Sequence, residues 1–226
     1  MKYSNIEKGI FLSRPNRFIA NIEIDGSIKV CHVKNTGRCA ELLIAGADVL
    51  VERSGNPDRK TEYDLVAVYK DGMLINIDSQ APNKVFGEWA ETSGYFGNIT
   101  AIRAERTYKS SRFDWYIEAD GRRIFVEVKG VTLEHGGVLM FPDAPTERGV
   151  KHLKELAEAV SDGYEAYVFF VAQMEKCKYF TPNRATHPQF ADALREVAKK
   201  GVNVRCVNCK VDTDGFSIKD FVEIVL

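Results

Sequence analysis

Three Asp-Gly pairs, each lying between two alternating apolar runs, constrain the fold of this chain more than any other feature. The pairs are Asp25-Gly26, Asp71-Gly72 and Asp120-Gly121. Both central residues of the tightest hairpin turn need a positive φ, which Gly and Asp tolerate better than most residues. Each pair therefore predicts a β-hairpin with a two-residue turn, and the turn fixes the register of the two strands.

The first two hairpins lie in a region of short strands. Residues 10–80 predict about five strands, together with one brief helix over residues 39–46. This many short strands in so short a region indicate a small closed barrel or a sandwich.

After Pro82 the pattern changes to one in which helices and strands are mixed. The predicted order is helix, three strands, helix, strand, helix, strand, which indicates a mixed α/β sandwich. The clearest helices are residues 146–161 and 188–201, and the first has an apolar face made by Val150, Leu153, Leu156, Ala157 and Val160. We place a domain boundary near residues 80–83, which divides the chain into domains 1–82 and 83–226.

The charge balance argues against a basic nucleic-acid-binding protein. Lys and Arg number 31 against 32 Asp and Glu, for a formal net charge of −1, so any phosphate binding must come from local patches. No apolar run is long enough for a signal peptide or a membrane span, so we expect a cytoplasmic protein that does not contact a membrane. The five cysteines, Cys206 and Cys209 among them, are expected to be free thiols.

The third hairpin brings acidic residues together. If Asp120-Gly121 is the turn, Asp114 on the first strand faces Glu127 on the second. Alternation places Asp114, Glu127 and Lys129 on one face of the hairpin. The other face is expected to be apolar, with Phe113, Trp115, Ile117, Ile124, Val126 and Val128.

Two carboxylates in directly opposed positions repel each other. At about 5 Å and an effective dielectric constant of 20, the repulsion is about 3 kcal/mol. A divalent cation offsets it, and so does the neighbouring Lys129. The alternative is a solvated polar face on which Lys129 and Arg112 balance the two acids, as is common in antiparallel pairs. The helices that follow favour burial of the carboxylates in a cleft.

An Asp on one strand and Glu-x-Lys on the next, preceded by a helix, resemble the core of PD-(D/E)xK nucleases. The resemblance implies that Asp114, Glu127 and the carbonyl group after Glu127 hold Mg²⁺, with Mn²⁺ as a substitute. It also implies that Lys129 positions or activates the attacking water.

Two details of this resemblance concern neighbouring residues. The family often adds a glutamate from the preceding helix, for which Glu88 is the best match and Glu91 the second. Phe113 stands where the pattern usually has proline, which is a tolerated variation.

Longer segments are similar to the sugar fermentation stimulation protein family. They are HVKNTGRCAELL at 32–43, SRFDWYIE at 111–118, VEVKGVTLEHGG at 126–137 and FPDAPTERGVKHLKEL at 141–156. The resemblance implies an N-terminal all-β, OB-like barrel and a C-terminal PD-(D/E)xK (restriction-endonuclease-like) domain, a mixed sheet flanked by helices. It also implies non-specific DNA binding and a role in regulating sugar (maltose) metabolism.

Candidate DNA-binding residues lie near the first hairpin and in a later helix. OB folds bind single strands through a basic groove with stacking aromatic residues. The candidates in the barrel are Arg14, Arg17, Phe18, Lys34, Arg38 and, from the family resemblance alone, Asn35. Scattered surface charge explains the same pattern equally well.

The start of the helix at residues 146–161 offers a second candidate surface. Its backbone N–H groups, together with Arg148 and Lys151, are suited to phosphate. The alternative is ordinary helix capping by Asp143 or Thr146. We interpret His152 on this helix as structural or solvated.

Three functional hypotheses follow. The first is a DNA-binding protein with little sequence readout, because no helix-turn-helix pattern is present. The second is an Mg²⁺-dependent nuclease, with RNA open as a substrate. The third is a scaffold or small-ligand regulator, which the balanced charge permits. The oligomeric state stays open.

Overall fold

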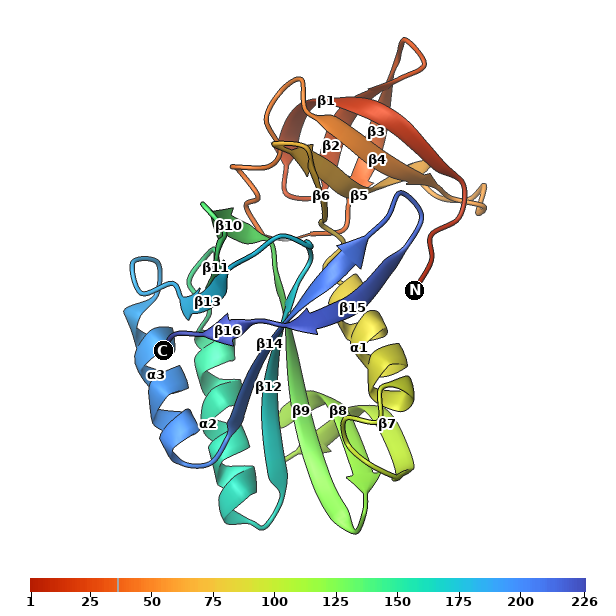
Figure 1. The fold of residues 1–226 in the computed structure, drawn as a ribbon. Coiled ribbons are helices and arrows are strands. Elements are labelled where there is room, and N and C mark those ends of the chain that lie inside the picture. The colour runs from red at the N-terminus through yellow and green to blue at the C-terminus, as the bar shows by residue number, and fades with distance from the viewer. Residues whose placement is uncertain (36) are drawn as a thin grey trace.

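The computed structural model describes residues 1–35 and 37–226, and its first six strands form a barrel (Figure 1). The strands are β1 (Ile6–Asn16), β2 (Ile19–Ile24), β3 (Ser27–Val33), β4 (Asp48–Arg53), β5 (Tyr63–Lys70) and β6 (Met73–Asn76). Their order is β3-β2-β1-β4-β5-β6, and β3 also pairs with β5, which closes the first five strands into a ring. Along β2, the side chains of Ala20, Ile22 and Ile24 alternate into the barrel interior, which explains its apolar pattern.

The three expected hairpins are confirmed. They join β2 to β3, β5 to β6, and β8 (Ser111–Ala119) to β9 (Arg122–Val131). In all three turns the Asp has a φ of 48 to 50° and the Gly has a φ of 71 to 75°. Both turn residues therefore adopt the left-handed conformation for which Asp-Gly is suited.

The second domain is built on a mixed six-stranded sheet. Its remaining elements are α1 (Ala81–Thr92), β7 (Ile99–Tyr108), β10 (Leu133–His135), β11 (Val138–Phe141), α2 (Glu147–Ser161), β12 (Glu165–Ala172), β13 (Tyr179–Pro182), α3 (Pro188–Lys199), β14 (Asn203–Val211), β15 (Phe216–Phe221) and β16 (Glu223–Ile224). The sheet has the order β15-β14-β12-β9-β8-β7, with parallel pairing at its centre and antiparallel pairing at both edges. Strands β10, β11, β13 and β16 form a second, smaller sheet.

Helices cover both faces of the large sheet (Figure 1). Helix α1 packs on one face around Phe86 and Phe169, while α2 and α3 pack together on the other face around Leu153, Leu156 and Leu194. Thr146 begins α2 as its N-cap, because its Oγ1 accepts a hydrogen bond from Gly149 N at 3.0 Å.

Two sequence expectations need correction. Residues 39–46 form successive turns and not a helix, since Cys39 adopts a φ of 47° and the segment is too short to continue. The strands β1, β10, β11, β13, β15 and β16 were not expected. Polar and apolar residues are mixed along β1, and the other five strands are short, so none of them has a clear periodicity. By contrast, the five cysteines are free thiols, as expected, and Cys206 and Cys209 of β14 lie in separate cores on opposite faces of the sheet.

The two domains share direct contacts. Phe216 N donates a hydrogen bond to Met1 O, and Tyr3 N donates to Asp214 O, so the first residues of the chain pair with the second domain. Gln173 Nε2, at the end of β12, donates to Asn76 Oδ1 at 2.8 Å. The division after residue 82 stays a prediction.

Among the residues that the structure describes, no helix is both long enough and apolar enough to cross a membrane.

Candidate functional site

The β8–β9 hairpin has the expected register. Trp115 pairs with Val126, and the pairing continues to Ala119 and Arg122 beside the turn. Asp114 and Glu127 follow one step beyond the last pair, where the ladder ends. Asp114 Oδ2 accepts a hydrogen bond from Val128 N at 2.7 Å, so its side chain takes the place of a ladder bond.

The expected single apolar face is wrong in one respect. Phe113 lies with the α2 side of the sheet, where its ring centroid is 5.3 Å from that of Phe125 and 6.0 Å from that of His152. Trp115 and Val126 belong to the core on the α1 side. The simple alternation fails at Phe113 because the β8–β9 ladder stops at Trp115.

Asp114 is held from the α1 side. Its Oδ1 accepts a hydrogen bond from Asn83 Nδ2 at 2.8 Å, and Asn83 Oδ1 accepts one from Trp115 Nε1 at 3.2 Å. Burial and then repulsion by Glu127 raise the pKa of Asp114 above its ordinary 3.8. The two carboxylates therefore interact, although each is supported by a different helix.

Glu127 is held from the α2 side and is 2% exposed. His152 Nδ1 lies 2.6 Å from Glu127 Oε1, and Lys129 Nζ contacts the same oxygen. Burial alone would raise the pKa of Glu127, but the hydrogen bond from His152 and the charge of Lys129 hold it below its ordinary 4.5. The other oxygen, Glu127 Oε2, is buried and has no hydrogen-bond partner among the described residues.

This set of donors fits a divalent cation. Carboxylate oxygens are the ligands that Mg²⁺ and Ca²⁺ prefer, and a buried oxygen without a partner costs about 1–3 kcal/mol. Asp114 and Glu127 supply such oxygens. Across the described residues, however, no group of three or more His, Cys, Asp or Glu side chains converges as a metal site. A cation here would draw its other ligands from backbone, water or substrate.

Glu88 contacts the N-terminus of the chain and has no recorded contact with Asp114 or Glu127 among the described residues. Its Oε2 is 2.6 Å from the amino group of Met1, and its side chain is 51% exposed. Glu91 is exposed on the same helix. The role of Glu88 as a helper ligand stays a prediction.

Sequence reasoning missed Asn83 and left His152 open as structural or solvated. The structure shows that His152 is buried and contacts Glu127. One signal in the sequence was available. His152 precedes Leu156 by four residues and Ala159 by seven, so it shares the buried stripe of α2. Asn83 gave no such signal, because nothing local relates it to Asp114.

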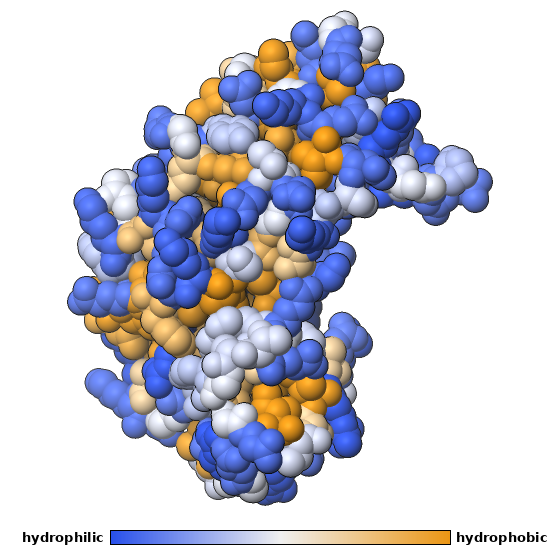
Figure 2. Space-filling model, turned by 45° about the vertical axis from the view of Figure 1, so that its right-hand side comes forward, coloured by the Kyte–Doolittle hydropathy of each residue, from blue (hydrophilic) through white to orange (hydrophobic). Residues whose placement is uncertain are grey.

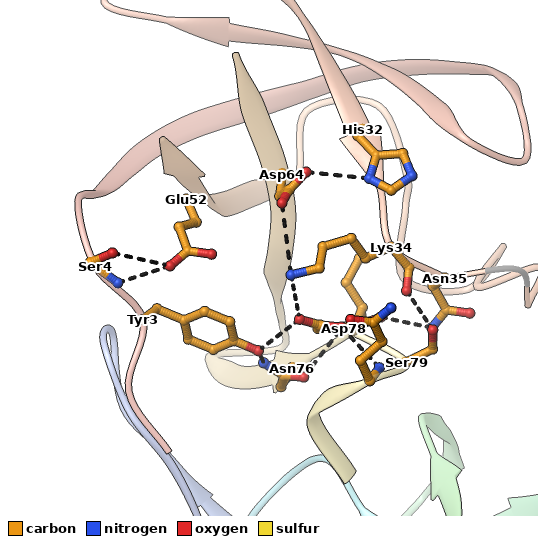
Figure 3. Close-up of polar contacts among 12 residues, drawn as sticks. Tyr3, Ser4, His32, Lys34, Asn35, Glu52, Asp64, Asn76, Asp78 and Ser79 are labelled. Carbon is orange, nitrogen blue, oxygen red and sulfur yellow. Dashed lines mark hydrogen bonds and ion pairs between the residues drawn. The ribbon is translucent and has the colours of Figure 1, made fainter. Parts of the chain in front are cut away.

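Lys34 and Asn35 form part of a buried polar network in the barrel (Figure 3). Lys34 Nζ lies 2.9 Å from Asp78 Oδ2 and 3.7 Å from Asp64 Oδ2. Asn35 Nδ2 donates to Ile77 O at 2.8 Å. The Lys34 ammonium group and the Asn35 amide group, which are the groups that would contact DNA, therefore already have partners within the protein.

Arg14 and Arg38 stabilise the loop that follows β3. The guanidinium group of Arg14 donates to four backbone carbonyl oxygens, at 2.6 to 3.0 Å, those of Arg17, Asn35, Gly37 and Arg38. Arg38 N donates to Asp143 Oδ2 at 3.0 Å, which ties the loop to the second domain. Arg38 itself is exposed.

Arg17 and Phe18 have the exposure that DNA contact requires. Phe18 is 49% exposed, and the Arg17 guanidinium carbon lies 5.8 Å from the centre of its ring. On α2, Arg148 is exposed but its Nε donates to His152 Nε2 at 3.3 Å. Lys151 Nζ donates to Ser110 O at 3.2 Å. DNA binding stays a prediction for these four residues and equally for Arg14, Lys34, Asn35 and Arg38.

Two family models match the chain. The model described as Sugar fermentation stimulation protein RE domain matches residues 80–215, and that described as SfsA N-terminal OB domain matches residues 12–77. The expected architecture, an OB-like barrel followed by a restriction-endonuclease-like mixed sheet with helices, is confirmed.

Individual relatives match over their whole length. A sugar fermentation stimulation protein homolog of Desulfitobacterium hafniense (strain Y51) is 58% identical over 100% of this chain and 99% of its own. The homolog of Ruminiclostridium cellulolyticum is 54% identical over 100% of both chains. A solved structure of Pyrococcus furiosus SfsA in complex with Ca²⁺ superposes with a TM-score of 0.91 at 28% identity, covering 100% of this chain and 98% of that one.

Proposed function

The chain belongs to the sugar fermentation stimulation protein family, and we propose that it binds DNA without sequence readout and cleaves phosphodiester bonds with a divalent cation. Asp114 and Glu127 would hold the cation, with Mg²⁺ as the expected ion and Mn²⁺ as a substitute. The observation that carries the proposal is the Asp114–Glu127 pair, in which Glu127 is buried, one of its oxygens lacks a partner among the described residues, and Lys129 contacts the other.

Each residue of the site has a distinct task. The cation would supply positive charge to offset the charge that develops on the phosphate. Lys129 projects from β9, its side chain is 19% exposed, and it can donate a hydrogen bond to an attacking water or a phosphate oxygen. Asn83 and Val128 N hold Asp114 in a fixed orientation before substrate binds.

The barrel supports a role in binding the nucleic acid. Phe18 is free to stack on a base, and Arg17 beside it is free to approach a phosphate. The space-filling view shows a wide hollow on one side of the molecule, between the barrel and the second domain, with a mostly hydrophilic rim (Figure 2). The complex of the Pyrococcus furiosus protein with Ca²⁺ supports divalent-cation binding in the family.

Cleavage assays test the enzymatic part of the proposal. Labelled single- and double-stranded DNA and RNA are incubated with the protein and Mg²⁺ or Mn²⁺. We expect cleavage that Asp114→Asn abolishes and that Glu88→Gln retains if Glu88 only pairs with the amino group of Met1. Cleavage that survives in Asp114→Asn would assign the activity to another site or a contaminant.

A DNA-binding protein without cleavage is the second candidate, and it includes the role as a regulator of sugar (maltose) metabolism. The exposed Arg17–Phe18 pair favours it independently of the acid pair. Binding should weaken steeply with salt, because neutralising phosphates releases counterions. Affinity for DNA no better than for another acidic polymer at moderate salt would contradict DNA binding altogether.

A further inference from the structure

Helix α2 places two basic side chains in line with the candidate cation site. Arg148 and His152 lie four residues apart, so they occupy the same side of successive turns. Arg148 is exposed, whereas His152 is 4% exposed. Arg148 Nε, His152 and Glu127 Oε1 form a chain of contacts that runs from the surface to the buried carboxylate, at 3.3 and 2.6 Å.

The contact with Arg148 indicates which ring nitrogen of His152 accepts a hydrogen bond. Arg148 Nε always carries a hydrogen and can only donate, so His152 Nε2 accepts in this contact. The proton of the neutral imidazole then lies on Nδ1. His152 Nδ1–H therefore donates to Glu127 Oε1.

This contact decides which oxygen of Glu127 is free. Oε1 receives hydrogen bonds from His152 and Lys129, which occupy its two lone pairs. Oε2 receives none from the described residues, although it is buried. We propose that His152, oriented by Arg148, is a positioning residue that turns Glu127 so that Oε2 faces a divalent cation. This inference rests on the cation site of the proposed function.

A purely structural role for His152 makes different predictions. Its ring packs edge-on against Phe113, with ring centroids 6.0 Å apart, and packing alone would tolerate another aromatic ring. His152→Phe retains that packing and changes no charge, but it removes the donor. His152→Asn loses the packing but keeps an N–H donor at the position of Nδ1.

Replacing Arg148 distinguishes two explanations, because an effect of charge alone and an orienting role predict opposite changes in cation affinity. Removing a positive charge near a cation site strengthens cation binding if only the Coulomb repulsion between the two positive charges matters. If Arg148 acts by orienting His152, its removal weakens binding. Lys151→Gln is the matched control, because it removes the same charge from the same helix, and Lys151 contacts Ser110 O and not His152.

The experiment is a titration of the full-length, DNA-free protein with Mn²⁺, followed by electron paramagnetic resonance of the free ion. We expect His152→Phe to weaken Mn²⁺ binding by about 10- to 100-fold, as loss of a supporting partner typically does. We expect His152→Asn to stay within about threefold of the wild type, and Arg148→Leu to weaken binding by about three- to tenfold. Lys151→Gln should leave binding unchanged or slightly tighter.

The outcomes separate this inference from the function on which it rests. If the wild type does not bind Mn²⁺, or if Asp114→Asn binds it equally well, the cation site itself is wrong. If Asp114→Asn loses binding while His152→Phe retains it, only the positioning role is wrong. If His152→Phe does not fold, as thermal unfolding would show, Arg148→Leu decides, since tighter binding in that variant overturns the inference.

Discussion

Replacing Lys34 with Met removes the cation that separates two buried carboxylates in the barrel. Lys34 Nζ lies 2.9 Å from Asp78 Oδ2 and 3.7 Å from Asp64 Oδ2, and the two acid side chains are only 3% and 8% exposed. Asp78 would keep the backbone N–H of Gln80, at 2.9 Å, and a longer contact with the hydroxyl group of Tyr3. Neither of these is charged.

The magnitude follows from the burial of the pair. Removing one partner of a buried ion pair costs about 3–5 kcal/mol, because the other charge is left without compensation. Lys34 itself is a fifth exposed and Asp64 retains Arg59, so we expect about 3 kcal/mol. For a chain of this length that loss lowers the melting temperature by about 6–12 °C.

Thermal unfolding of the full-length protein, followed by circular dichroism, measures this loss. Lys84→Met is the matched control, because Lys84 lines the same cavity of about 140 Å³ but is exposed and forms no ion pair with the described residues. The double variant Lys34→Met/Asp78→Asn should recover part of the loss, since the buried charge is then removed. A melting temperature for Lys34→Met within about 2 °C of the wild type would refute the reasoning.

Three further predictions concern other parts of the chain. Burial alone would raise the pKa of Asp64, but Arg59 and Lys34 hold it below its ordinary 3.8. The contribution of the ionised Asp64 to stability is therefore present above pH 3.8, and it is lost as the pH falls through the lower pKa of the folded state. Urea unfolding at stepped acid pH should therefore show a flatter acid limb for Asp64→Asn than for the wild type; parallel limbs would contradict this. A Cβ at Gly87 would lie 2.5 Å from the Trp115 ring, so Gly87→Ala should destabilise the protein by about 1–2 kcal/mol in unfolding experiments, despite the better helix propensity of alanine. Because Trp115 also donates a hydrogen bond to Asn83, the same variant should bind Mn²⁺ more weakly in a titration. Phe18→Ala should weaken single-stranded DNA binding by about tenfold in fluorescence anisotropy, whereas Ile28→Ala, which truncates another exposed barrel residue, should not; an equal loss in both would argue against stacking.

The local features of the fold were predictable from short stretches of sequence. The three Asp-Gly turns predicted three hairpins, and the third also predicted the register that brings Asp114 near Glu127. The apolar stripe of α2 was likewise readable, whereas the sequence left its cap open between Asp143 and Thr146, and the structure shows Thr146. Each of these depends on residues that are close in the chain, where turn conformation and side-chain periodicity act directly.

The supporting partners of the site were not predictable in this way. Asn83 reaches Asp114 from 31 residues away, and His152 reaches Glu127 from 25 residues away. Lys34, a candidate for DNA contact, lies against Asp78 because the barrel closes around both residues. Local patterns do not specify which helix covers which face of a sheet.

The sequence by itself therefore determined the hairpins, the main helices and the strand register that brings the two acids near each other, because these follow from neighbouring residues. Only the tertiary structure decided that α1 holds Asp114, that α2 holds Glu127, and that one buried oxygen is left without a partner. The physical reason is that hydrogen bonds between distant elements form only after those elements have packed.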